Sequence, residues 1–513
     1  MARINSNVSS LIAQFNLARS NENMEIRLQR LATGLRINRG ADDPAGLIIS
    51  ERLGTDISGV EQAVKNGERA SSVIATTEAS LSEVNELLNS IKGLIVESAN
   101  TGANSQEERD ANQLQIDSAI RSITRISNTA TFGGLKLLDG NLDYVTSGIS
   151  STAISKTQIF GASFIGTTQL QVEVDVLTSA QKGALYMHPE QGPLTGSAFT
   201  STVTLQVTGS RGVQEYEFPS GQTLDRVITA INARTSLTGV TAEFVNGNAT
   251  SGVVFKSELY GSNSFVSVER VNNNTLTQPP PTIEAIDSNA PVPSTFVFGT
   301  GTSDSIRDVG KDVQALVNGS LANGQGLVIS TNSPVLSSEI LLAEAFATDP
   351  TATATTFDII GGGSTYQLGP EVNALQQENV GVASVAASKL GGVLKNGGLQ
   401  FLSSIQKGGL NDIETSLQRN DFSTASDILE QAIDEITIMR GRLGAFERNV
   451  LDTNKRSLQS AVENLSASRA VIRDADFAAE TSQLSRAQIL QSAGTTVLAL
   501  ANQQAQSVLQ LLG

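Results

Sequence analysis

Residues Ala70 to Ser98, which read ASSVIATTEASLSEVNELLNSIKGLIVES, decide the fold of this chain of 513 residues. Small or apolar side chains recur there at spacings that alternate between four and three, at Ala70, Ile74, Thr77, Leu81, Val84, Leu88, Ile91, Ile95 and Ser98. This period predicts a long helix with a coiled-coil or bundle seam. Asp43 and Pro44 predict its start, an N-cap with proline at the first helical position, and about Asn100 its end. Such a helix, about 80 Å long, cannot bury its stripe alone.

Further helices are predicted on both sides of this one. A helix over residues 106–128, which ends before Thr131-Phe132-Gly133-Gly134, carries Leu114, Ile116, Ile120, Ile123 and Ile126. An upstream stripe, followed by breaks at Gly34 and Gly40, consists of Ile4, Val8, Leu11, Phe15, Ala18, Met24, Leu28, Leu31 and Leu35. Near the other end one helix is lined by Leu443, Phe446, Val450, Leu458 and Leu465. A last helix carries Val497, Leu498, Ala501, Ala505, Val508, Leu509, Leu511 and Leu512. Both ends of the chain are therefore predicted to be helical.

The middle of the chain differs from the ends in charge and proline content. Residues 141–400 carry about −10 of the net charge of −16, and eleven of the twelve prolines lie between Pro189 and Pro370. Proline is excluded from helix interiors, so long helices are not expected there. Residues 170–176 and 202–207 alternate with period two, which predicts half-buried strands. The fold class that follows is a multidomain α+β protein, with a helical core built from both ends and inserted β-rich domains.

Two compact units are predicted within this middle region. Residues 202–270 favour two strands, a helix over 224–232, and two further strands. The run Gln278-Pro279-Pro280-Pro281 and the stretch to Pro293 are typical of a linker. A second small unit is then expected over about residues 294–370.

The composition excludes most catalytic chemistry. The chain has no Cys, no Trp and one His, His188, so cysteine nucleophiles, thiolate-ligated metals and HExxH metalloproteases are excluded. No phosphate loop, dinucleotide fingerprint or calcium loop is present in convincing form, and His188 is interpreted as a surface residue. No enzymatic activity, cofactor or metal is expected. An acidic chain also disfavours nucleic-acid binding, and no apolar stretch is long enough to cross a membrane.

The terminal helices instead indicate an interaction. Two such helices packed only on each other would leave about half of their apolar surface in water. We therefore expect them to be marginally stable in an isolated chain. Neighbouring copies could supply the missing burial, which would couple folding of the ends to assembly.

The ends of the chain resemble bacterial flagellin, the subunit of the flagellar filament. The resemblance rests on Leu31 to Asn38 (LATGLRIN), Ala41 to Gly46 (ADDPAG) and Glu97 to Asn100 (ESAN) near the N-terminus. Near the C-terminus it rests on Ile472 to Glu480 (IRDADFAAE), Ala487 to Gly494 (AQILQSAG) and Val508 to Leu512 (VLQLL). It covers about residues 1–145 and 375–513. Residues 202–270 also resemble an insertion motif found in many flagellins.

The resemblance implies four domains and a polymerisation interface. Residues 1–44 with 480–513 would form an inner coiled-coil tube, 45–145 with 375–479 a helical outer tube, and 146–293 and 294–374 two outer β-rich domains. The interface residues that it implies are Val8, Leu11, Phe15, Leu28, Leu31, Leu35, Arg36, Asn38, Asp42, Asp43, Val497, Ala501, Val508, Leu511 and Leu512.

The resemblance also implies a route and partners. Flagellins leave the cell unfolded through the flagellar type III channel, which fits a chain without an apolar signal segment and without thiols. The implied partners are many copies of the same chain, hook-associated and cap proteins, and an export chaperone that binds the C-terminal segment through Leu490, Leu498, Leu509 and Leu512. The mature protein would be extracellular, in the filament.

One patch departs from the family pattern. In flagellins sensed by the mammalian Toll-like receptor, an Arg stands where this chain has Ser90, and Glu and Arg stand where it has Gln115 and Ala119, while Leu94 is retained. Weak receptor activation is therefore expected.

Three other interpretations remain open at this point. A hook-filament junction protein shares the helical ends, but the C-terminal pattern through Leu512 favours flagellin. A cytoplasmic coiled-coil scaffold would explain the heptads but not the paired terminal motifs. Catalysis by the middle domains has no residues to support it.

Overall fold

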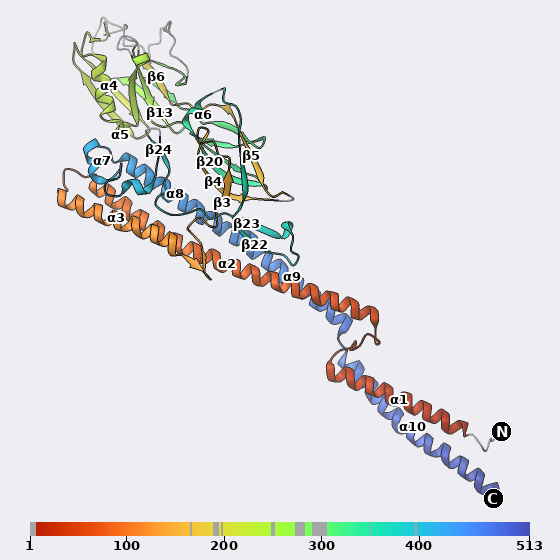
Figure 1. Cartoon of the computed structure of the whole chain (residues 1–513). Coiled ribbons are helices and arrows are strands. Elements are labelled where there is room, and N and C mark those ends of the chain that lie inside the picture. The colour runs from red at the N-terminus through yellow and green to blue at the C-terminus, as the bar shows by residue number, and fades with distance from the viewer. Residues whose placement is uncertain are drawn as a thin grey trace. The chain divides into compact units, whose positions relative to one another are not determined.

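The computed structural model describes residues 7–164, 167–187, 194–195, 198–247, 252–271, 283–289, 305–349, 351–395 and 398–512 (Figure 1). The chain forms two compact units. Unit 1 comprises Met1–Arg69, Gln367–Gln376 and Arg448–Gly513, and unit 2 comprises Ala70–Tyr366 and Gln377–Glu447. The predicted combination of helical ends with a β-rich middle is confirmed.

Unit 1 is helical and contains both ends of the chain. Its elements are α1 (Val8–Thr33), the first part of α2 (Pro44–Ser98), α9 (Asp452–Arg473) and α10 (Phe477–Leu512). The predicted start of α2 is confirmed, because Asp43 Oδ1 accepts a hydrogen bond of 2.9 Å from Gly46 N. Gly34, at φ +71°, ends α1 in the left-handed conformation that glycine adopts at little cost.

Unit 2 contains the seam that decides the fold. All nine seam positions from Ala70 to Ser98 are buried, as predicted. Around the seam lie α3 (Gln106–Thr129), α7 (Ile413–Arg419) and α8 (Ser423–Phe446). Lys92 on α2 pairs with Glu430 on α8 at 2.9 Å, and Asn112 on α3 donates a hydrogen bond to Ser98. The stripe along α2 thus finds its partners within the same chain.

Two details of the predicted helices are wrong. Leu114 is 61% exposed, because it lies about 200° around α3 from Ile116 and therefore faces away from the buried stripe. The stripe predicted on one helix from Leu443 to Leu465 is divided between α8, a π-helical turn (Glu447–Leu451) and α9. Leu443 is buried, but no residue of α9 is.

The first β-rich core of unit 2 is formed by two sheets packed on each other. One has the strand order β17-β16-β5-β21-β3 and the other β18-β19-β20-β4. Val172, Val174 and Val176 of β5 are buried in this core, which confirms the predicted period of two. The strands are β3 (Tyr144–Ser147), β4 (Ile154–Ala162), β5 (Leu170–Thr178), β16 (Gln314–Val317), β17 (Ser320–Leu321), β18 (Asn323–Gln325), β19 (Val328–Asn332), β20 (Leu336–Leu342) and β21 (Thr355–Gly362).

The second β-rich core lies within the sequence of the first. Its sheets have the orders β10-β9-β13-β15 and β11-β12-β6-β14, and α4 (Leu224–Asn232) and α5 (Thr235–Thr238) belong to it. The helix predicted over 224–232 is confirmed, but three strands follow it before residue 271, not two. The strands are β6 (Ala184–Met187), β9 (Val203–Gly209), β10 (Gly212–Phe218), β11 (Val240–Phe244), β12 (Val253–Ser257), β13 (Phe265–Arg270), β14 (Ile283–Ala285) and β15 (Ser305–Val309).

Strands on either side of the predicted domain boundary between residues 293 and 294 pair with each other. β5 pairs with β16 and β21, and β13 pairs with β15, so neither predicted β-rich segment closes on its own strands. The remaining elements are short: β1 (Thr131–Phe132), β2 (Leu135–Lys136), β7 (Leu194–Thr195), β8 (Ala198–Phe199), α6 (Glu344–Thr348), β22 (Ser364–Gln367), β23 (Gln377–Val380), β24 (Val393–Lys395) and β25 (Gly398–Gln400).

Three sequence interpretations concern residues that the structure does not describe, namely Ile4, His188 and the linker at 278–281. Among the described residues, no helix is long and apolar enough to span a bilayer.

Candidate assembly interface

The helices α1 and α10 of unit 1 run antiparallel and pack through small and polar residues (Figure 1). Asn7 Nδ2 donates a hydrogen bond of 2.9 Å to Ala501 O, and Ser20 Oγ donates one of 3.3 Å to Ala487 O. The buried residues of the two facing surfaces are Ser10, Ala13, Glu480, Ala487 and Ala501. A seam of such small side chains brings the helices close together but removes little apolar surface from water.

Several large apolar side chains of both helices are exposed, although the half-buried Leu17 of α1 packs against Gly494 of α10. Leu11 is 61% exposed and Phe15 is 77% exposed. Helical geometry explains this, because the stripe of Leu11, Phe15 and Ala18 lies on the face opposite Ala13. On α10 the exposed large side chains are Phe477, Ile489, Leu490, Val497 and Leu500. The pair therefore presents two apolar surfaces that no described part of the chain covers.

The predicted polymerisation residues divide between these surfaces and the seam. Val8, Leu11, Phe15, Leu28 and Val497 are exposed, whereas Leu31 and Leu35 are half-buried. Ala501 is buried and belongs to the seam between the two helices. The side chains of Val508, Leu511 and Leu512 lie outside the described part of the chain.

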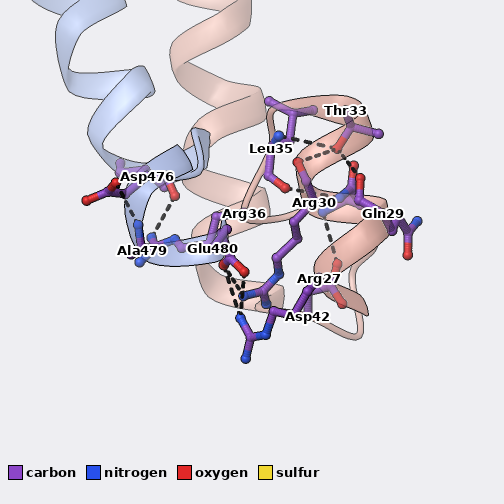
Figure 2. A network of polar contacts seen from close by, with 12 residues as sticks. Arg27, Gln29, Arg30, Thr33, Leu35, Arg36, Asp42, Asp476, Ala479 and Glu480 are labelled. Carbon is purple, nitrogen blue, oxygen red and sulfur yellow. Dashed lines mark hydrogen bonds and ion pairs between the residues drawn. The ribbon is translucent and has the colours of Figure 1, made fainter. Parts of the chain in front are cut away.

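A buried ion-pair cluster ties the first turn of α10 to α1 (Figure 2). The carboxylate of Glu480, whose side chain is 8% exposed, accepts hydrogen bonds of 3.0 Å from Arg27 Nη1 and 3.1 Å from Arg30 Nη1. Asp476 caps the same helix by accepting from Ala478 N and Ala479 N. Sequence reasoning missed this cluster, because partners 450 or more positions apart leave no local pattern.

The polar residues of the motif between α1 and α2 form hydrogen bonds within the chain (Figure 2). Asp42 Oδ2 accepts hydrogen bonds of 2.9 Å from Arg39 N and from Asn38 N, and these donors hold the pKa of the Asp42 carboxyl below its usual value. Arg36 N donates a 2.7 Å hydrogen bond to Arg473 O, while the Arg36 guanidinium donates to Ile472 O at 2.6 Å. Arg36 thus joins the two terminal segments by one main-chain and one side-chain hydrogen bond.

Close packing at the start of α2 explains the glycine that follows Asp43. A Cβ on Gly46 would lie 2.5 Å from Asp43 Oδ2 and 2.7 Å from Ile37 Cδ1. Ile37 is buried, and Asp43 caps the helix, so neither neighbour can move freely. The structure thus assigns Asn38, Asp42 and Asp43, which were predicted as interface residues, hydrogen bonds inside the chain.

The residues predicted to contact the chaperone and the receptor are partly accessible. Leu490 is exposed and Leu498 half-buried, while the side chains of Leu509 and Leu512 lie outside the described residues. Ser90 on α2 and Gln115 on α3 are exposed. Leu94 and Ala119 beside them are half-buried.

The described residues contain no metal-type cluster, that is, no group of three or more His, Asp or Glu side chains placed to hold an ion.

Comparison with known proteins matches both ends of the chain. A family model described as the bacterial flagellin N-terminal helical region matches residues 4–143, and one described as the C-terminal helical region matches residues 426–512. B-type flagellin of Pseudomonas aeruginosa PAO1 is 30% identical over 513 residues, and flagellin of Salmonella choleraesuis SC-B67 is 28% identical over 533 residues. Each alignment covers 99% of both chains. A solved structure of FliC from Burkholderia pseudomallei covers 74% of this chain and 99% of its own at 11% identity, with a TM-score of 0.23 that carries no structural argument.

Proposed function

Because the chain belongs to the bacterial flagellin family, we propose that it is a filament subunit whose α1–α10 pair joins it to other copies of itself. Flagellins are structural proteins of the extracellular flagellar filament that serves motility. The proposal concerns how this chain assembles and which of its surfaces take part.

The exposed apolar side chains of α1 and α10 carry the proposal. Val8, Leu11 and Phe15 face outward beside a seam of alanines and serines. Fully burying one such side chain is worth about 1.5–3 kcal/mol. Neighbouring copies that cover these faces would therefore supply the stabilisation that the two-helix pair lacks, and folding of the ends would be coupled to polymerisation.

Truncation of the C-terminal segment tests this role. Deleting residues 480–513 removes almost all of α10, and with it Glu480, but leaves both β-rich cores intact. We expect the truncated chain to keep its thermal unfolding transition for the β-rich cores and to lose polymerisation onto filament fragments. The full-length chain is the control. Filaments that still grow from the truncated chain would disprove the assembly role.

We further propose the division into domains that the family resemblance implies. Residues 1–44 with 480–513 form the inner layer, 45–145 with 375–479 the next, and the β-rich cores the outer surface. The concentration of negative charge in residues 141–400 supports an outer position. Chemical labelling of lysines in filaments tests the outer position of the β-rich cores. Lys182 and Lys311 should react with the reagent, and a lack of reaction at both lysines would contradict this position.

Export as an unfolded chain with a dedicated chaperone is part of the proposal. The absence of Cys supports it, since no disulfide can trap the chain. The exposed Leu490 and the half-buried Leu498 would contact the chaperone. Leu490→Ser with Leu498→Ser should lower the secreted amount and chaperone co-purification together, whereas Leu177→Ser, at an exposed leucine of β5, should change neither. Unchanged co-purification would reject these contacts. Hook-associated and cap proteins are the partners proposed at the ends of the filament.

Weak activation of the mammalian Toll-like receptor is a further proposal. Ser90, Gln115 and Ala119 remove the charges that receptor-activating flagellins carry at these places. A reporter-cell assay should show low activation, and Ser90→Arg with Gln115→Glu and Ala119→Arg should raise it. Full activation by the unmodified protein would refute this expectation.

A further inference from the structure

A groove runs along the α1–α10 pair of unit 1. It has a volume of about 640 Å³, and small residues such as Ala13, Ala487 and Gly494 line it. Leu490 and Val497 line it at one part. Arg19 and Arg486 also line it, and both are exposed. Neither arginine forms an ion pair with any described residue, unlike Arg27, which holds Glu480.

The opposite face of α1 is complementary to this groove. Leu11, Phe15, Glu22 and Glu25 follow one another at spacings of four, seven and three, so they lie on one face of the helix. All four are exposed. Glu22 and Glu25 make no ion pair within the described chain. The face thus has bulky apolar groups at its start and two uncompensated carboxylates farther along.

Along the direction of α1, apolar side chains come first and charged side chains second, both in the groove and on the exposed face. Ser20 contacts Ala487 and Asn7 contacts Ala501, so α10 runs antiparallel to α1. Along the direction of α1 the groove therefore passes Val497, then Leu490, then Arg486. Residues 483–497 of α10 line it, and the face extends over residues 11–25, a length of about 21 Å in each case. A second α1 lying parallel to the first would meet apolar groups first and opposite charges next.

We propose that the occupant of this groove is α1 of a second copy of the chain. Leu11 and Phe15 of that copy pack over the small residues beside Leu490 and Val497, and Glu22 and Glu25 pair with Arg19 and Arg486. This inference rests on the proposed function and specifies its contacts.

The contact also accounts for open-ended growth. The part of the groove lined by Ala13 and Ser20 lies on the side of α1 opposite Leu11 and Glu22, and Arg19 lies at the edge between the two surfaces. Each copy can therefore use one surface to bind the preceding copy and the other to bind the next. Such a head-to-tail contact does not close on itself unless the rotation happens to form a ring, and otherwise it builds a helical filament.

Charge reversal in two chains tests the pairing. One variant carries Glu22→Arg and Glu25→Arg, and the other carries Arg19→Glu and Arg486→Glu. Elongation of wild-type filament fragments is measured by light scattering and electron microscopy. Each variant alone opposes like charges at every contact, so we expect its critical concentration to rise at least about tenfold. In an equimolar mixture the two variants can alternate along the filament, so that every contact joins opposite charges. The critical concentration of the mixture should therefore lie within about threefold of the wild-type value.

Controls separate this inference from the proposed function. Glu217→Arg with Asp225→Arg places the same charge change on an exposed part of the second β-rich core, and it should polymerise like wild type. Reversed variants that elongate normally on their own would overturn the pairing, and so would a mixture that fails to elongate. Failure of the wild-type chain to elongate would instead overturn the filament function itself.

Discussion

The stripe on α2 and the stripe on α1 have the same heptad-like spacing but opposite surroundings. Leu81, Val84 and Leu88 of α2 are fully buried within unit 2. Leu11 and Phe15 of α1 are mostly exposed, although α1 packs along its whole length on α10. Other elements of the same chain bury the stripe of α2, whereas no described element buries the stripe of α1.

The difference in exposure between the two stripes distinguishes residues that stabilise the folded chain from residues that are available to contact another copy. A spacing of three and four shows that one face of a helix is apolar, but it does not show which partner covers that face. In α2 the partners are α3 and α8 of the same chain, whereas in unit 1 the buried residues between α1 and α10 are mostly alanine and serine, with the half-buried Leu17 packed against Gly494. Large apolar groups left outside an intramolecular seam are the basis of our proposal that this surface binds another copy of the chain.

The largest effect on the isolated chain is expected in the buried stripe. Leu88→Ala removes a fully buried side chain from the seam and should lower the free energy of unfolding of unit 2 by about 2–5 kcal/mol. Leu114→Ala, at the exposed leucine of α3, is the matched control and should cost less than about 0.5 kcal/mol. Thermal or chemical unfolding of the monomer measures both, and equal effects would remove the distinction between the stripes.

A smaller effect is expected from the buried carboxylate of unit 1. Glu480→Gln leaves Arg27 and Arg30 without a counter-charge, and we expect a loss of about 1–3 kcal/mol because the two arginines keep some contact with water. The loss should be confined to α1 and α10 and is measured by hydrogen exchange of their amides in the filament, where these helices are expected to be protected. Glu22→Gln on the exposed face should leave the exchange rates unchanged, and faster exchange in α3 would contradict a local effect.

The cap of α2 should contribute less. Asp43→Ala removes the acceptor for Gly46 N and should cost about 1 kcal/mol of stability in unit 1. Asp56→Ala, at an exposed position within the same helix, controls for the loss of a charge. An equal effect of the two substitutions would show that the cap contributes nothing.

The smallest effect on the monomer should come from the exposed stripe. Phe15→Ala is expected to change the unfolding free energy of the isolated chain by less than about 0.5 kcal/mol. The same substitution should raise the critical concentration for filament elongation at least about tenfold, since a buried phenylalanine at an interface is worth more than about 1.4 kcal/mol. A destabilised monomer that still elongates normally would reverse the assignment of this stripe.

The parts of the fold that follow from local pattern were predicted from the sequence. The start of α2 at Pro44, its nine-residue seam and the helix over 224–232 depend on residues within a few turns of one another. The pairing of β5 with β16 was not predictable in this way, because the partners lie more than 130 residues apart. The domain boundary expected near residue 293 failed for the same reason.

The candidate site was predicted only in part. Val8, Leu11 and Phe15 were identified from their spacing, and the structure adds that they face outward. The ion pairs of Glu480 with Arg27 and Arg30 were not predicted, because single charged residues on different helices form no sequence pattern that indicates a contact. The hydrogen bonds of Asp42 depend on a specific turn, which motif recognition alone does not describe.

Hydrogen exchange of the monomer and of the filament tests the central claim most directly. The claim is that the chain completes the core around α2 by itself and completes the surface of α1 and α10 only with other copies. Amides of α2 from Leu81 to Ile95 should be protected in both states. Amides of α1 and α10 should exchange rapidly in the dilute monomer and become protected in the filament. Strong protection of α1 and α10 in the dilute monomer would contradict the account.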